Sequence, residues 1–463
     1  MSITEKARRS THPVMILLGI LCLASLMTWV VSSGSFERDG RLVVPGSYTQ
    51  IQKERSLPGV LVAPDVGDES AAPVSLAQTL LAIPAGLERG SSLIFMVLII
   101  GGMFGILDRA GIVDNGINRL LRAVRGNIQL LIVALMLVFS AGSAFLGLAS
   151  EYLIVIPVMT AMAARIGLPT ITGFAIVTLA VKIGYLASVT NPIPLTIAQP
   201  LVGVPIFSGA GLRLFFYAVF LVVGIGFMLY EVRHAKAAEI STLQEINVPP
   251  VSLREGLMLA VLPFGLAAIV WGSTRMQWAH HELSACYIAV SILLAACSSL
   301  AANEAADAFI GGMKKVLLAS SLIGVAMAVT IVLEQGRILD TIVDALNGLI
   351  GENGAYATAV WMFISQLLLD FMIPSTSGQA AVTMPVLAPL SQLAGVGPQT
   401  TVSAFLFGNG ITNMLTPTSG TLLAYLAAGR IEWSAWLRYV LPIWGLFILV
   451  AFGLLGVAVV VGA

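Results

Sequence analysis

Two polar segments interrupt hydrophobic stretches that are otherwise long enough to cross a membrane. Residues 187–199 (ASVTNPIPLTIAQ) and 413–424 (NMLTPTSGTLLA) place proline, asparagine, threonine and serine inside apolar runs. Proline removes a helix hydrogen bond, and an unsatisfied backbone group in lipid costs several kcal/mol, so each break must face protein, water or a bound solute. Paired breaks in two halves of a chain indicate a transport site.

Two further polar segments, residues 147–151 (GLASE) and 374–379 (PSTSGQ), have the pattern of helix tips. Helix N-termini there favour a carboxylate, while unwound carbonyls and hydroxyls can hold a hard cation or the solute. The alternative is that these groups only satisfy the backbone of kinked helices. The residues predicted to bind a small anionic or zwitterionic solute are Ser150, Glu151, Thr190, Asn191, Pro192, Ser375, Thr376, Ser377, Gly378, Gln379, Asn413, Thr416, Thr418 and Ser419. A Na⁺ site is a candidate at Thr190, Asn191, Asn413 and Thr416.

Glu151, Lys182 and Asp370 are charged residues inside apolar segments. A lone charge at such depth costs at least ~2.5 kcal/mol, so each is a candidate coupling residue. Glu151 could carry a proton, bind a cation or a cationic substrate, or reach water at the floor of a funnel. Lys182 and Asp370 could offset their cost by pairing; otherwise Lys182 could face a substrate carboxylate, stand in for a coupling cation, or have a structural or snorkelling role.

Composition sets the class of protein. Of the 463 residues, 57% are hydrophobic and 10% are charged, with a mean hydropathy of +0.94. This is too apolar for a soluble protein of this length. The zero net charge provides no basic field for nucleic acid, and the four scattered His suggest no metal site. We expect a lipid bilayer as the environment, with no nucleic-acid partner and no cofactor.

Basic clusters predict the orientation in the membrane. They lie at Lys6, Arg8 and Arg9, at Arg109, Arg119, Arg122 and Arg125, at Arg233 and Lys236, and at Lys314 and Lys315. The positive-inside rule assigns these clusters to the cytoplasm, which puts the N-terminus inside and the loop 34–75 outside. Residues 13–31 are interpreted as a retained first span rather than a signal peptide. The expected location is the cytoplasmic (inner) membrane.

Two apolar segments fit poorly as single crossings. Residues 129–165 start and end on the cytoplasmic side around a polar centre, which favours a re-entrant hairpin. Residues 354–394 repeat this pattern between segments assigned to the outside, so the second hairpin is inverted. Charged residues before it are interpreted as a solvated amphipathic face: Arg337, Asp340, Asp344 and Glu352.

The spacing indicates a duplication. The interval from Gly111 to Pro192 is as long as that from Gly336 to Pro417, and each contains a hairpin and ends in a broken helix. We expect an all-α polytopic membrane protein of two inverted repeats, each with a re-entrant hairpin and a broken transmembrane helix, and about nine full spans. The predicted units are residues 1–89 (first span and outer loop), 90–235 (first repeat), 236–314 (linker spans) and 315–463 (second repeat).

Four motifs carry a resemblance to a known family. They are residues 43–48 (VVPGSY), the run from Asn191 through Ala198 and Gln199 to 207–209 (FSG), residues 373–385 (IPSTSGQAAVTMP), and Asn413 with 416–420 (TPTSG). The chain resembles, over nearly its whole length, the YfcC-like transporters, relatives of the DcuC dicarboxylate carriers within the ion-transporter superfamily. The resemblance implies a scaffold domain, an elevator-type transport domain made of the hairpins and broken helices, and a homodimer.

The chain departs from the pattern of that family. Related chains usually have two acids where this one has Ser150 and Glu151, which weakens any transfer of a basic-amino-acid substrate. They also tend to have a small residue near Lys182 and an Asn near Asp370. A joint origin of these two charges is the economical explanation.

Three classes of function are compared. A secondary carrier predicts paired broken helices, which the sequence has. A membrane-embedded enzyme needs a nucleophile, metal ligands or paired acids, and a channel needs a symmetric filter or an uninterrupted polar stripe; neither pattern is visible. We expect a cation-coupled symporter or an exchanger, and not an enzyme, for a small carboxylate-bearing solute. An amino acid is the first choice and a four-carbon dicarboxylate the alternative, with Na⁺ or H⁺ as the candidate coupling ion.

The topology is testable by cysteine labelling. A single Cys in the loop 32–75 and one near Ala237 should react with impermeant reagents from opposite faces of the membrane, because basic segments stay in the cytoplasm. Cysteines at Gly126 and Arg165 should react from the same face. Labelling of these last two positions from opposite faces would rule out the first hairpin.

Overall fold

The protein is described by a computed structural model that covers residues 13–39, 42–44, 46–56, 58–62, 67, 70–112, 127–234, 252–276, 278–348 and 354–462. Most of these residues are helical. Seven of the described helical segments are long and apolar enough to cross a membrane: Ser91–Arg109, Ile128–Leu146, Thr170–Leu201, Ala210–His234, His280–Cys297, Ala302–Gln335 and Trp433–Val461. The expected total of about nine spans stays a prediction. The basic residues Lys6, Arg8, Arg9, Arg119, Arg122, Arg125 and Lys236, and also Glu352, lie outside the described residues.

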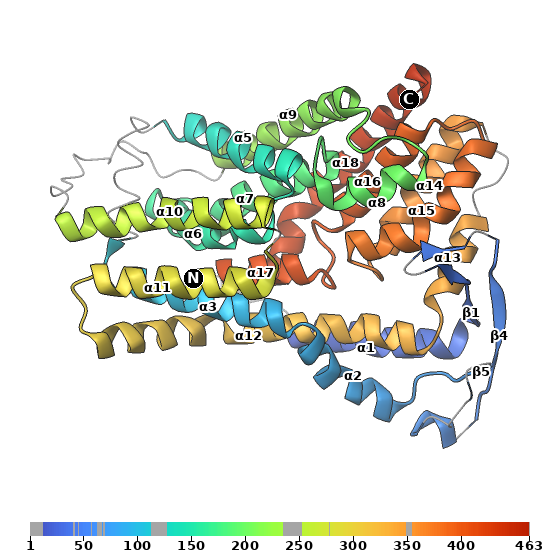
Figure 1. The fold of residues 1–463 in the computed structure, drawn as a ribbon, viewed down its shortest axis with the longest axis horizontal. Helices are drawn as coiled ribbons and strands as arrows, with labels where there is room; N and C mark the ends of the chain where they lie inside the picture. Colours follow the sequence, from blue (N-terminus) through green and yellow to red (C-terminus); the bar gives the residue numbers. More distant parts are fainter. Residues whose placement is uncertain are drawn as a thin grey trace, which may run out of the picture.

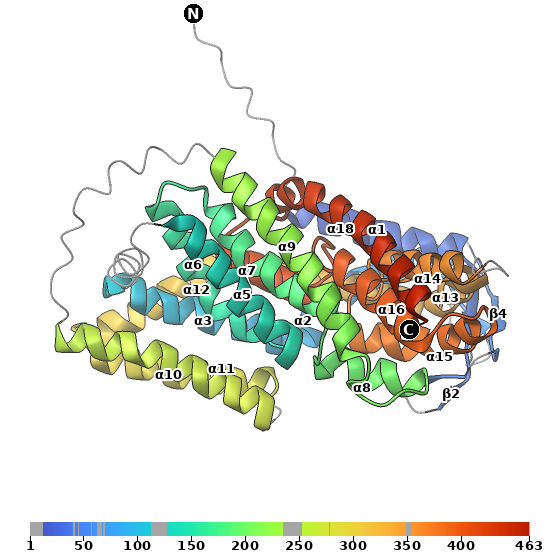
Figure 2. The same ribbon diagram turned by 90° about the horizontal axis from the view of Figure 1, so that it is seen from above.

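One group of helices is built on the longest helix, α12 (Ala302–Gln335), on which α1 (Pro13–Val30), α2 (Leu76–Arg89) and α3 (Ser91–Arg109) pack. In the same group, α11 (His280–Cys297) packs on α3, and α10 (Leu253–Arg275) packs on α11. Figures 1 and 2 show α3, α10, α11 and α12 side by side. The contact between α3 and α12 is close because glycines face each other: a Cβ added at Gly312 would lie 2.1 Å from the Gly101 carbonyl oxygen.

The second group contains both segments that the sequence predicts to be hairpins and both broken helices. From the first half come α5 (Ile128–Leu146), η2 (Ser150–Ile154), α6 (Val155–Arg165), α7 (Thr170–Ala187), α8 (Pro192–Leu201) and α9 (Ala210–His234). From the second half come α13 (Leu339–Gly348), α14 (Ala355–Leu369), α15 (Thr376–Leu393), α16 (Pro398–Thr412), α17 (Gly420–Gly429) and α18 (Trp433–Val461). The halves interlock, because α7 packs on α16, α8 on α15, and α17 on α6. Helix α17 also packs on α3 and α12, so it joins the second group to the first.

Local sequence explains where the helices break. Helix α5 ends at Gly147, whose φ of +76° suits glycine, and α7 ends at Ser188 in the left-handed region (φ +40°). The Asn191 side chain then caps α8, which starts at Pro192. In the second half, Ser375 caps α15 and Ser419 caps α17 in the same way. The breaks therefore occupy residues 147–149, 188–191, 370–375 and 413–419.

Short strands modify the all-α expectation. β1 (Ser33–Ser35) pairs antiparallel with β4 (Thr49–Lys53), β4 pairs parallel with β5 (Ser70–Ala71), and β2 (Arg38–Asp39) pairs with β3 (Leu42–Val43). A 3-10 turn, η1, covers Pro58–Val60. These strands lie beside α13 at the end of the molecule opposite α10 and α11 (Figure 1). The sequence missed them because they are short and paired only through the folded loop.

The solvated role predicted for Asp340 is wrong. Asp340 is only 7% exposed, and its carboxylate forms an ion pair with Arg38 at 2.7 Å and accepts a hydrogen bond from the Phe36 backbone N–H. The loop that contains Phe36 and Arg38 covers Asp340, and the position of Asp340 in the periodic pattern of α13 gave no sign of this contact. Asp340 therefore fastens the strand region to the helix before the second hairpin.

The glycine contact between α3 and α12 yields a stability prediction. Gly312→Ala should lower the free energy of unfolding by about 1–3 kcal/mol, because the new methyl group collides with the backbone of α3. Gly311→Ala is the matched control, since nothing lies within 4 Å of a Cβ at Gly311. Thermal unfolding of the purified variants in detergent measures both. Equal melting temperatures for the two variants would contradict the close approach of the two helices.

Candidate functional site

A buried polar network lies where the second hairpin meets the second helix break. Asp370, at the end of α14, is fully buried. Its Oδ1 accepts hydrogen bonds from Asn409 Nδ2 at 2.7 Å and from Asn413 Nδ2 at 3.5 Å. Asn409 and Asn413 are four residues apart on α16 and its end, so they lie on one helix face. The second Asp370 oxygen, Oδ2, is buried and has no hydrogen-bond partner among the described residues.

Side chains of α7 reach this network from the other half. The Lys182 ammonium donates to Asn413 Oδ1, and the Tyr185 hydroxyl donates to Asn409 Oδ1 at 3.1 Å. Lys182 is 5% exposed. The direct Lys182–Asp370 ion pair considered from sequence does not form; the Asn413 amide lies between the two charges and contacts both. The two charged groups remain close enough to interact electrostatically.

The tip of the second hairpin is held by the same network. Asn409 Nδ2 donates to Gln379 Oε1 at 2.8 Å, and Gln379 Nε2 donates to Gln366 on α14 at 2.9 Å. Thr376 donates to Asn409 Oδ1 at 3.1 Å, and Ser419 donates to Asn413 Oδ1 at 3.0 Å. The N-termini of α15 and α17 are thereby fixed to one cluster of amides.

Other predicted residues of the second half lie outside this network. Thr416 and Thr418 share a hydrogen bond of 2.8 Å, and Thr418 also donates to the Phe371 carbonyl at 2.9 Å, so they satisfy the backbone of the hairpin tip. Ser375 accepts from Gly378 N–H at 3.3 Å as a helix cap. The Ser375 and Ser377 side chains are exposed.

The first helix break is built differently. Thr190 donates through its N–H to the Ala144 carbonyl and through its hydroxyl to the Phe145 carbonyl, at 3.1 and 3.0 Å. Asn191 Oδ1 accepts from the Ile193 N–H at 3.0 Å and sits against Gly147, where a Cβ would lie 2.6 Å from that oxygen. Asn191 Nδ2 is buried and has no partner among the described residues. Pro192 is exposed at the start of α8.

Arg213 on α9 is a site residue that the sequence interpretation missed. It is 1% exposed, and its guanidinium donates to the carbonyls of Ser188 and Val189 at 3.1 Å each. It also donates to Gln399 Oε1 at the start of α16, at 2.9 Å. The unwound carbonyls of the first break therefore already face a positive charge. The feature of the sequence that could have identified it is a lone Arg in an apolar segment.

Glu151 lies in a separate cluster. The residue is 8% exposed, and its carboxylate accepts a hydrogen bond from the Ala149 N–H at 2.8 Å, while the Ala149 carbonyl accepts one from the Tyr425 hydroxyl of α17 at 2.6 Å. Glu151 also interacts electrostatically with His280 and Tyr287 on α11. Ser150 is partly exposed beside it. No hydrogen bond among the described residues joins Glu151 to Lys182 or Asp370, so the polar site of each half is distinct.

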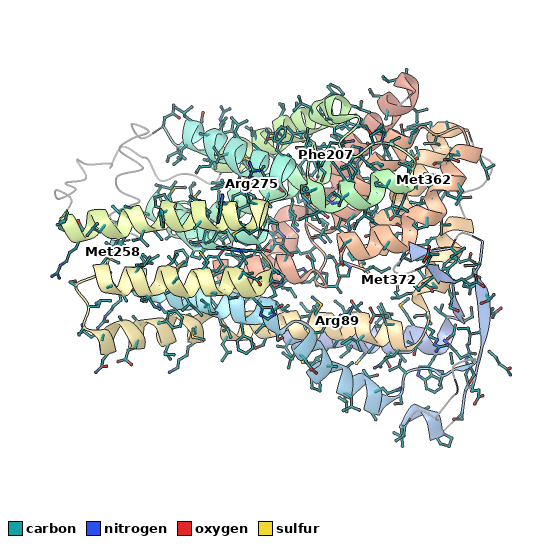
Figure 3. All side chains as sticks on the ribbon, in the orientation of Figure 1. Arg89, Phe207, Met258, Arg275, Met362 and Met372 are labelled. Atoms are coloured by element: carbon teal, nitrogen blue, oxygen red, sulfur yellow. The ribbon has the colours of Figure 1, made fainter. Side chains whose placement is uncertain are left out.

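A cavity of about 520 Å³ lies between the two helix groups. The tip of the second hairpin and Gly420, the first residue of α17, line one side. Arg89 and Glu334 line the other; they form a two-fold hydrogen-bonded ion pair at 2.7 and 3.1 Å. Their side chains are 48% and 45% exposed. Arg89 is labelled where α2 and α12 meet (Figure 3).

Long apolar helices that break inside the protein, with buried polar side chains at the breaks, are typical of membrane transporters. Comparison with known proteins identifies the family. The family model described as "DcuC: C4-dicarboxylate anaerobic carrier" matches residues 11–460. The chain therefore belongs to this transporter family, as the motifs predicted.

Individual relatives span its whole length. The chain is 30% identical to the "Putative basic amino acid antiporter YfcC" of Escherichia coli (strain K12), with 97% of each chain covered. It is 24% identical to an uncharacterized protein of Haemophilus influenzae, with 96% of each covered. The solved structure of the Alcanivorax borkumensis YdaH transporter aligns with 98% of this chain and 99% of that one, at 16% identity and a TM-score of 0.42.

The bridge from Lys182 through Asn413 to Asp370 predicts non-additive mutations. Lys182→Met or Asp370→Asn alone should lower stability by about 3–5 kcal/mol, because each strands a buried charge. The double variant should recover most of the loss, which thermal unfolding of all four proteins measures. Additive losses in the double variant would show that the two charges are independent.

Proposed function

We propose that the protein is an elevator-type secondary transporter of a small carboxylate-bearing solute, located in the cytoplasmic membrane with its N-terminus inside. The observation that carries the proposal is the cavity where the N-termini of α15 and α17 converge opposite Arg89. Helix N-termini present N–H groups and a positive dipole end, and guanidinium groups bind carboxylates in a fork geometry. The volume, about 520 Å³, lies within the roughly 300–1,000 Å³ of ligand pockets.

Similar contacts in the two halves support inverted repeats over residues 90–235 and 315–463. Thr190 donates to a carbonyl beside the first hairpin tip, and Thr418 donates to one at the second. Gly184 brings α7 against α5, and Gly408 brings α16 against α14, where added Cβ atoms would meet backbone oxygens at 2.2 and 2.7 Å. In this proposal the group around α12, with linker spans 236–314, is the scaffold and dimer contact, and the interlocked second group moves.

An amino acid remains the first choice of substrate. Two guanidinium–carboxylate pairs line the cavity, Arg89 with Glu334 and Arg38 with Asp340, so it offers partners for both ends of a zwitterion. The name of the Escherichia coli relative also points to amino acids. A four-carbon dicarboxylate is the alternative, supported by the description of the family. Coupling is to a cation gradient or to exchange of a second solute.

Solute binding is tested by a thermal-shift screen of the purified protein against amino acids and mono- and dicarboxylates. A ligand at 100 times its Kd adds ~2.7 kcal/mol to stability. Hits are then tested as uptake into proteoliposomes. A screen in which neither class stabilises the protein, together with absence of uptake, would overturn the proposal.

Charge changes in the cavity should separate the two substrate classes. Arg89→Gln should weaken binding of either class about tenfold or more, because a charge-assisted hydrogen bond is worth about 1.5–3 kcal/mol. Glu334→Gln should weaken binding of an amino acid but preserve or strengthen binding of a dicarboxylate, since it removes only the acid. Arg275→Gln, at the end of α10 (Figure 3), is the matched control and should leave binding unchanged. Unchanged affinity in Arg89→Gln would place the carboxylate site elsewhere.

A further inference from the structure

The second helix break has the oxygen ligands that a monovalent cation prefers. Asp370 supplies a carboxylate, Asn413 an amide oxygen and Ser419 a hydroxyl, and hydrogen bonds join all three residues. Such hard oxygens, gathered where a transport helix unwinds, are the usual ligands of Na⁺. The cluster is closed to bulk water, with exposed fractions of 0%, 7% and 1% for the three residues.

The protein itself places a cation in this cluster. The Lys182 ammonium donates to Asn413 Oδ1, the oxygen that also accepts from Ser419, and interacts electrostatically with Asp370. Among the described residues whose side chains are hydrogen-bonded in this network, Asp370 alone has a carboxylate. One lysine and one aspartate leave the cluster neutral. Adding Na⁺ would leave a net positive charge in a buried site, where desolvation costs several kcal/mol per ion.

At the first helix break, a cationic side chain also contacts the oxygens, but it is an arginine and the oxygens are backbone carbonyls. Its unwound carbonyls, Ser188 O and Val189 O, accept hydrogen bonds from the buried Arg213 guanidinium. Such carbonyls are also typical cation ligands in broken helices. Each break thus has an internal cationic side chain in contact with the oxygens that would otherwise bind a metal ion.

We propose that Lys182 is a resident cation that takes the place of Na⁺ at the second helix break, so that this transporter binds and moves its solute without Na⁺. The consequence for transport rests on the function proposed above, whereas the occupancy of the cation position rests only on the contacts around Lys182. Coupling then falls to protons or to exchange of solutes.

Removing the ammonium should create a Na⁺ site. Lys182→Ala leaves Asp370, Asn413 and Ser419 around a vacated volume that a Na⁺ ion with water can fill, whereas Lys182→Met fills that volume with apolar atoms. We expect the melting temperature of the wild type to be equal in NaCl and in choline chloride at the same ionic strength. In choline chloride, both variants should have a lower melting temperature than the wild type. Replacing choline with Na⁺ should raise the melting temperature of Lys182→Ala but not that of Lys182→Met. The double variant Lys182→Ala with Asp370→Asn should lose that response.

The controls separate this proposal from the proposed function. Lys315→Ala changes an exposed lysine of α12 that pairs with Asp108 at 3.2 Å, and it should show no difference between the two salts. The unfolding assay needs no transported solute, so a failed transport assay does not affect it. A wild type that Na⁺ stabilises or whose uptake needs Na⁺, or a Lys182→Ala variant that melts equally in both salts, would overturn the proposal.

Discussion

A helix that stops inside an apolar bundle leaves backbone groups that need partners, and the rest of this structure depends on how two such breaks are satisfied. At the first break, the solution is a buried guanidinium on two carbonyls. At the second, the Thr418 hydroxyl and the Asn413 amide donate to the carbonyls of Phe371 and Pro374, and the Ser419 hydroxyl accepts from a backbone N–H at the start of α17. The sites are therefore chemically different, although the order of elements around them is the same.

The polar partners also join the two halves. Lys182 and Asn413 are 231 residues apart in the sequence, and Arg213 and Gln399 are 186 apart, yet each pair shares a hydrogen bond. Because α7 and α16 are held together at both breaks, movement of one half without the other would strand buried charges. The cavity instead lies between this block and the helices around α12, bordered by an ion pair that is nearly half exposed. This division favours movement of the whole block against the scaffold.

The sequence predicted where helices begin and end, but it did not predict which residues pair with the buried polar side chains. Gly147 marks where a helix stops, and Pro192, Ser375 and Ser419 mark where helices start, because glycine, proline and capping residues act within a few positions of themselves. The cost of burying Lys182 and Asp370 indicated a shared site, but not that an asparagine amide would fit between them. Arg213 and Asn409 were missed because their partners come from distant segments. Asp340 was misread because the loop that covers it is remote in sequence.

The central claim, that solute passes by movement of the hairpin block at the cavity beside α12, is tested most directly by a reversible cross-link. Cysteines replacing Met327 on α12 and Ser375 at the hairpin tip, in a chain without Cys22, Cys286 and Cys297, would be joined across the cavity by a reducible bifunctional thiol reagent. Uptake of the identified solute into proteoliposomes should stop on cross-linking and return on reduction. Uptake at an unchanged rate in fully cross-linked protein would contradict the account.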